Sequence, residues 1–166
     1  MMIDPKPGAW VWPAAMIVWG PGSTSARHSH HCIQLVMVLQ GKLRIRSGPG
    51  DPWRTRGAAL VRPDANHEVD ARGRTLLIGF VDPESELGTV LMERIKSDIS
   101  HVPATQVEQW RLSLGSKLTP MRVERWVRQD RFCDFDNSTY FWCDGWIGAF
   151  RNCVTTEASC ADAKIV

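Results

Sequence analysis

The sequence lacks the long apolar run that a membrane-spanning helix requires. Its longest apolar stretches, such as residues 33–39, are far shorter than the roughly 20 residues that cross a bilayer. The first 20 residues also lack the basic segment followed by an apolar segment that is typical of a secretory signal. We therefore expect a cytoplasmic protein without a membrane span.

Paired cysteines and a strong charge surplus are missing as well. The five cysteines are an odd number and form no Cys-X-X-Cys pair, so neither a disulfide framework nor a cysteine zinc site is indicated. Twenty basic residues nearly balance eighteen acidic ones, for a net charge of +2. A surface committed to phosphate carries a much larger basic surplus, so the composition gives no indication of nucleic-acid binding.

Short apolar runs separated by glycine and proline dominate the first half of the chain. They occupy residues 10–19, 32–39, 43–46, 58–61 and 76–81. Regular breaks between short runs of this kind are typical of an antiparallel β-barrel or sandwich. The 166 residues, of which 43% are hydrophobic, therefore predict one β-rich globular domain with an appendage.

The apolar period changes after residue 81 and predicts helices. Asp82 is placed as the N-cap of a helix that runs to about residue 97. Thr105 and Glu108 have the spacing of a capping box at the start of a second helix. A third helix is expected to begin at Thr119.

These patterns divide the chain into three parts. Residues 1–81 form the predicted barrel, and residues 82–131 form a helical segment that packs on the barrel or on the partner of a dimer. Residues 132–166 contain four of the five cysteines and form a tail of unassigned structure.

Three histidines and one glutamine have the spacing of a metal site. His28 and His30 flank one residue, so their rings project from the same face of a strand, and Gln34 follows on that face. His67 arrives from a later strand. Three imidazoles and an amide oxygen suit a divalent ion such as zinc, nickel, iron or manganese. The alternative, that they are ordinary polar residues in the mouth of a barrel, stays open.

The same residues carry a resemblance to a known family. Residues 22–41 read Gly-X5-His-X-His-X3-Gln-X6-Gly and resemble the first motif of the cupins, with Gln34 where that motif usually has glutamate. Residues 57–67 resemble the second motif, although Ala65 replaces its glycine and His67 comes one position early. The resemblance implies a mainly β fold: a cupin (double-stranded β-helix or jelly-roll) barrel followed by two or three C-terminal α-helices.

A narrower resemblance covers about residues 10–131. Residues 28–36, 63–70 and 81–85 are similar to the N-terminal sensing domain of AraC-type transcription regulators. In that family the barrel binds a small effector, the following helices form a homodimer, and a separate domain contacts DNA. No such DNA-binding domain is recognisable here, so we expect a sensor domain without its DNA-reading half.

A small-molecule sensor needs a mostly apolar pocket beside a few polar groups. The residues expected to line such a pocket next to the histidines are Trp19, Val36, Val38, Ile45 and Phe80. Because alternate residues of any small barrel face inward, plain core packing is the alternative for all five.

Two other functions stay open beside the binding module. The first is a metal-dependent enzyme of the isomerase or lyase type that acts on a small carboxylate or sugar. The neutral Gln34 would leave the metal its full charge, which suits polarisation of a bound oxygen. Its proton-transfer group is not fixed, and Arg62, Glu68 and Asp70 are candidates. The second is a scaffold whose histidines have lost their role.

Overall fold

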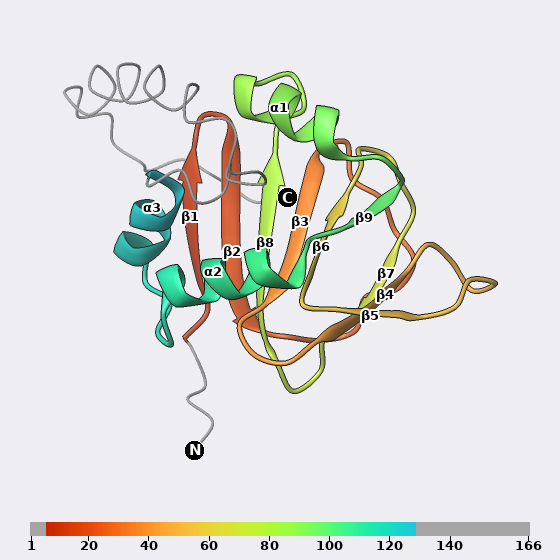
Figure 1. The fold of residues 1–166 in the computed structure, drawn as a ribbon, viewed down its shortest axis with the longest axis horizontal. Helices are drawn as coiled ribbons and strands as arrows, with labels where there is room; N and C mark the ends of the chain where they lie inside the picture. Colours follow the sequence, from red (N-terminus) through yellow and green to blue (C-terminus); the bar gives the residue numbers. More distant parts are fainter. Residues whose placement is uncertain (1–5, 129–166) are drawn as a thin grey trace. The chain divides into compact units, whose positions relative to one another are not determined.

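The computed structural model describes residues 6–128, which form nine β-strands and three α-helices (Figure 1). The strands are β1 (Gly8–Trp12), β2 (Ala15–Pro21), β3 (Ile33–Val38), β4 (Leu43–Arg46), β5 (Arg54–Arg56), β6 (Ala58–Val61), β7 (Glu68–Asp70), β8 (Thr75–Val81) and β9 (Ile99–His101). The helices are α1 (Glu86–Arg94), α2 (Ala104–Leu114) and α3 (Pro120–Arg128). The predicted tail at 132–166 lies outside the described residues, and the boundaries at 81 and 131 remain predictions.

The strands form two antiparallel sheets. The larger has the order β1-β2-β8-β3-β6-β9 and the smaller the order β5-β4-β7. An apolar core between them joins β3 and β6 to β4 and β7, so β3 is buried on both of its faces. This arrangement confirms the predicted fold class, a mainly β jelly-roll barrel with helices near its C-terminal end.

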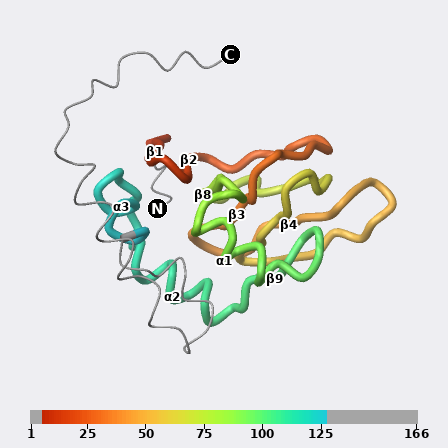
Figure 2. The backbone as a smooth tube through the Cα atoms, turned by 90° about the horizontal axis from the view of Figure 1, so that it is seen from above, coloured from red at the N-terminus to blue at the C-terminus, as the bar shows by residue number. Residues whose placement is uncertain are grey.

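The three helices lie on one side of the larger sheet (Figures 1 and 2). Burial along β8 alternates accordingly: Leu77 and Val81 are buried, whereas Ile78 and Phe80 are partly exposed. Because successive side chains of a strand point to opposite faces, the buried set marks the helix-covered face. The other face of β8 points toward the barrel interior. It carries Phe80, whose register partner on β3 is Gln34.

The run predicted at residues 10–19 is two strands. Pro13 interrupts it, and Val11 of β1 folds back to pair with Met16 of β2. A proline cannot donate to the strand ladder, so the chain turns at this point and forms a hairpin.

The predicted start of the first helix is wrong. The N-cap of α1 is Ser85, whose hydroxyl accepts a hydrogen bond from the Gly88 N–H at 3.0 Å. Asp82 instead closes the preceding turn, where its carboxylate accepts a hydrogen bond from the Glu84 N–H. Asp82 is a good capping residue in either place, and this local hydrogen bond moves the helix start by three residues.

The second helix also begins without the predicted capping box. Its N-cap is Pro103, with no capping hydrogen bond from the side chain, and Glu108 pairs with Arg111 on the helix surface. The third start is confirmed, because the Thr119 hydroxyl accepts a hydrogen bond from the Arg122 N–H. Among residues 6–128, no helix combines the length and the hydropathy needed to cross a membrane.

Candidate metal centre

Three histidines meet where two loops are bridged to each other. His28 and His30 lie in the connection between β2 and β3 rather than in a strand, and His67 directly precedes β7. The His28 N–H donates to the His67 carbonyl at 3.1 Å, and the His67 N–H donates to the His28 carbonyl at 2.9 Å. This pair of backbone hydrogen bonds fixes the two loops together.

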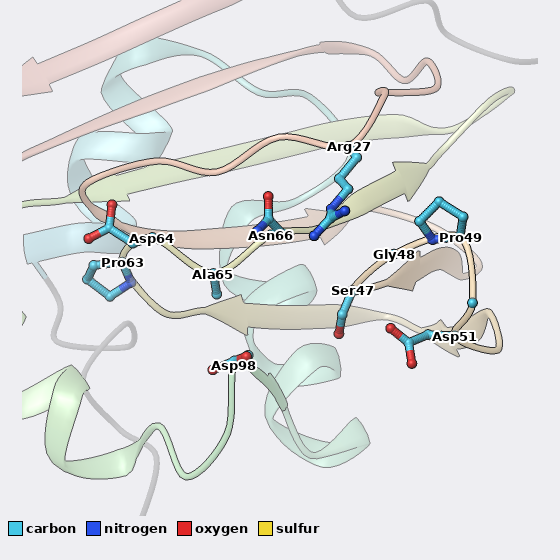
Figure 3. Close-up of a pocket in the computed structure, with 11 residues that line it drawn as sticks. Arg27, Ser47, Gly48, Pro49, Asp51, Pro63, Asp64, Ala65, Asn66 and Asp98 are labelled. Carbon is cyan, nitrogen blue, oxygen red and sulfur yellow. The ribbon is translucent and has the colours of Figure 1, made fainter.

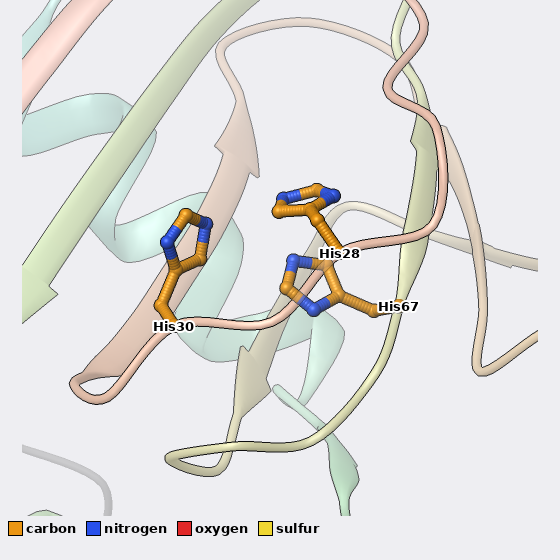
Figure 4. Close-up of side chains that lie close together, drawn as sticks. All are labelled: His28, His30 and His67. Carbon is orange, nitrogen blue, oxygen red and sulfur yellow. The ribbon is translucent and has the colours of Figure 1, made fainter.

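The three imidazoles converge on one point (Figure 4). Each ring offers a nitrogen, and these three atoms lie within 4.8 Å of one another. The ring centroid of His28 lies 4.8 Å from that of His30 and 4.3 Å from that of His67. The spacing predicted from the sequence therefore brings the rings together although the segment is not a regular strand.

Two of the rings are oriented by the backbone. Nδ1 of His28 contacts the Ala26 carbonyl at 2.7 Å, and Nδ1 of His67 contacts the Ala65 carbonyl at 3.0 Å. A carbonyl can only accept, so each Nδ1 carries the proton and each Nε2 keeps a free electron pair. Histidine ligands of metals are oriented by hydrogen bonds of this kind. These carbonyls were not anticipated from the sequence, although each stands two residues before its histidine.

The environment favours the neutral form of His67 and His30. Burial lowers the pKa of His67 from its ordinary value of 6.5, and the neighbouring His28 and His30 lower it further. The pKa of His30 is also lowered, by burial and then by His28. Because metal binding requires the neutral imidazole, this shift favours a metal over protons near neutral pH.

Gln34 supplies a buried oxygen on the same side. It lies on β3, is only 3% exposed, and is the register partner of Phe80, whose ring meets that of His30 with centroids 5.2 Å apart. The Oε1 atom of Gln34 and the Nε2 atom of His67 are both buried without a hydrogen-bond partner. An unpaired buried polar atom is costly, and both atoms are electron-pair donors. The donor set therefore fits a divalent cation.

The five predicted lining residues fall into three places. Phe80 lies beside His30, partly exposed. Val36, Val38 and Ile45 belong to the closed core between the sheets and are at most 1% exposed. Trp19 lies on the helix-covered face, since its register partner Leu77 is on that face, and a Cβ atom at Gly8 would collide with its indole. Of the five, Phe80 is the one whose ring contacts a histidine ring.

Two of the three candidate proton-transfer groups, Glu68 and Asp70, are held in ion pairs, whereas Arg62 is exposed. Glu68 accepts two hydrogen bonds from Arg46, at 2.9 and 2.7 Å. Asp70 accepts hydrogen bonds from Arg72 and Arg44, and these lower the pKa of its carboxyl far below its ordinary value. Both carboxylates are thus engaged with arginines.

A polar surface pocket of about 500 Å³ lies beside the loop that leads to His67 (Figure 3). Its lining includes Arg27, Asp51, Asp64, Asn66 and Asp98, all exposed. None of the three histidines lines it. The pocket is therefore separate from the candidate metal centre.

Comparison with known proteins gives structural likenesses only. No family model and no curated protein matches the sequence. The solved structures that are similar include a cupin protein from Bacteroides fragilis, at 16% identity and a TM-score of 0.41, covering 51% of this chain and 83% of that one. A cupin-2 domain protein from Shewanella frigidimarina has 12% identity and a TM-score of 0.39, covering 49% and 84%. KdgF from a Halomonas species has 18% identity and a TM-score of 0.37, also covering 49% and 84%.

Proposed function

We propose that the protein is a small-molecule-binding domain that holds a divalent metal ion in its barrel. His28, His30 and His67 supply three imidazole nitrogens, and Gln34 supplies an amide oxygen. The observation that carries the proposal is the pair of buried, unpartnered donor atoms, Gln34 Oε1 and His67 Nε2, on the side of the barrel where the imidazoles converge.

All four donors are neutral, and this decides what the centre can do. A bound divalent ion would keep its full positive charge and polarise a carboxylate or carbonyl oxygen. The chain's own contribution is to hold the imidazoles in one tautomer through the Ala26 and Ala65 carbonyls. The site therefore favours an anionic or oxygen-rich organic ligand over a cationic one.

The test is the metal content of the purified protein, with the rise of its melting temperature on adding zinc, nickel or manganese. We expect about one ion per chain, because the described residues 6–128 contain one such donor set. The melting temperature should rise, because a ligand that binds only the native state stabilises it. His28→Ala combined with His30→Ala should abolish both signals. His31→Ala is the matched control, because its side chain is 98% exposed and contacts Asp64.

A circular dichroism spectrum shows whether the double variant folds. If it does not, His67→Gln provides a second test, because it keeps a polar side chain but removes the buried nitrogen. A native protein that takes up none of these metals contradicts the proposal, and so does binding that survives both variants.

We further propose an AraC-type sensor role in which the helices form a homodimer. Leu112 on α2 is 82% exposed and Met121 on α3 is 69% exposed, and apolar side chains on adjacent helices favour a contact with a second copy. Sedimentation should show a dimer that Leu112→Gln combined with Met121→Gln weakens. A native protein that stays monomeric at high concentration would contradict this arrangement.

A further inference from the structure

One face of the larger sheet is apolar and, within residues 6–128, only partly covered. On β1, β2 and β8 the helix-covered face is largely buried, whereas the opposite face is exposed or partly exposed. The smaller sheet packs against that opposite face over β3 and β6 and at Leu76 of β8. We call the uncovered part the apolar shelf, and its residues are Val11, Met16, Val18, Ile78 and Phe80.

The composition of this face is unusual for a surface. A sheet with one face in water normally alternates apolar and polar residues. On this face the three strands carry only apolar residues or glycine, including Ala9 and Gly20. A contiguous exposed apolar surface of this kind marks a binding site.

The shelf leads into the candidate metal centre. Val11, Met16, Phe80 and Gln34 are successive partners across β1, β2, β8 and β3. Exposure falls along this row, from 67% at Val11 to 37% at Met16 and 3% at Gln34. Adjacent strands lie about 4.8 Å apart, so the row is a continuous apolar path from solvent to the donor atoms, and the Phe80 ring touches that of His30.

We propose that the ligand is an amphipathic carboxylate, with an apolar chain or ring on the shelf and its carboxylate at the metal centre. This rests on the function proposed above, because the uncompensated charge of a metal held by four neutral donors selects an anionic head group. The shelf offers a sugar no hydrogen-bonding side chain, so a polyhydroxylated ligand would lose hydrogen bonds to water there without replacement.

The experiment is a calorimetric titration of the full chain, loaded with zinc, with butanoate, hexanoate and octanoate. We expect each added methylene to raise the affinity by about fourfold, the effect of burying one CH₂ group. Gluconate is the matched control, because it is also a six-carbon carboxylate. Gluconate should bind no more tightly than butanoate and much more weakly than hexanoate.

Two nearly isosteric substitutions test whether the alkyl chain of the ligand lies on the apolar shelf. Val18→Thr combined with Met16→Gln should weaken octanoate by about tenfold and leave butanoate unchanged, since only the longer chain reaches these side chains. Ser113→Ala changes an exposed side chain on α2 and should leave both affinities unchanged.

Three results separate the alternatives. Equal binding of butanoate, octanoate and gluconate to the zinc-loaded protein overturns the ligand class and leaves the metal centre intact. A dimer that Val11→Glu dissociates, combined with no methylene effect, assigns the shelf to a second copy and overturns the inference. If no metal binds but octanoate still binds more tightly than hexanoate, the result supports the apolar shelf as a binding surface and contradicts the proposed metal centre.

Discussion

The Gln34 side chain is poorly satisfied by the protein alone. Its Oε1 atom is buried among apolar strands without a hydrogen-bond partner, and such an atom lowers the stability of the metal-free fold. An apolar residue of the same size would pack better, and the metal centre proposed above would account for the glutamine.

Replacing Gln34 should therefore change stability and metal binding in opposite directions. Gln34→Leu is expected to raise the free energy of unfolding of the metal-free protein by about 1 kcal/mol, because it removes a buried unpaired acceptor. The same change should reduce the rise in melting temperature that zinc produces. Urea unfolding with and without zinc measures both effects, and a variant less stable than the native protein without metal would contradict this account.

The buried His67 makes the stability of the metal-free protein depend on pH. Burial holds its folded-state pKa below the ordinary value of 6.5. Below that value the unfolded chain takes up a proton that the folded protein does not, so the free energy of unfolding should fall as the pH falls.

Urea unfolding in a chelator, from about pH 8 to about pH 5.5, checks this sign. His67→Gln should flatten the dependence, and His101→Gln, on an exposed residue of β9, should not. Equal slopes for the native protein and His67→Gln would show that the buried imidazole is not the group responsible.

At the scale of elements, one arginine ties a helix to the barrel. Arg111 of α2 donates from Nε and Nη2 to the Val38 carbonyl, at 3.1 and 2.9 Å, and from Nη2 to the Gly41 carbonyl at 2.6 Å. Val38 ends the strand that carries Gln34. The arginine thus connects the end of β3 directly to α2.

Arg111→Met should lower the free energy of unfolding by about 2 kcal/mol, because it removes charged hydrogen bonds to two backbone carbonyls. Glu108→Gln is the matched control. It breaks only the exposed Arg111–Glu108 pair, so its effect should stay within about 0.5 kcal/mol. Guanidinium unfolding curves of the two variants measure both effects. Equal losses of unfolding free energy would mean that the hydrogen bonds from Arg111 to the carbonyls contribute nothing to stability.

Most element types were predictable from the sequence, but the short strands β5, β7 and β9 were not, and the starts of the first two helices were misplaced. Short runs between Gly and Pro gave the strands, and the change of period after residue 81 gave the helices. The start of α1 was misplaced because Asp82 and Ser85 can both cap a helix. The structure uses Ser85 as the cap while the Asp82 carboxylate accepts a hydrogen bond from the Glu84 N–H, and Gly88 packs against Pro83 with no room for a Cβ atom.

At the scale of the molecule, a closed core and an open shelf share one barrel. The sequence indicated the histidine cluster because spacing fixes which side chains can meet. It could not separate lining residues from core, because Val36, Val38 and Phe80 share a face and differ only in whether the smaller sheet covers them. Nor could it place Trp19, since β2 is apolar on both faces.

A substitution at Ile45 tests the separation of the closed core from the candidate metal centre. It is fully buried between the sheets, so Ile45→Val should lower the free energy of unfolding by about 1 kcal/mol through a small cavity. The number of metal ions bound and the zinc-induced rise in melting temperature should not change. A lost or weakened metal signal would place Ile45 in the site rather than in the core.

The backbone bridge between His28 and His67 also has a kinetic consequence. The two residues lie 39 positions apart in the chain, and they meet only when a long loop has closed. In the unfolded chain His28, His30 and His31 lie within four residues of one another, whereas His67 is far away along the chain. A metal that needs all three imidazoles therefore binds after the barrel has formed, so it should slow unfolding and leave the folding rate nearly unchanged. Bound zinc would then extend the lifetime of the native barrel by slowing its unfolding.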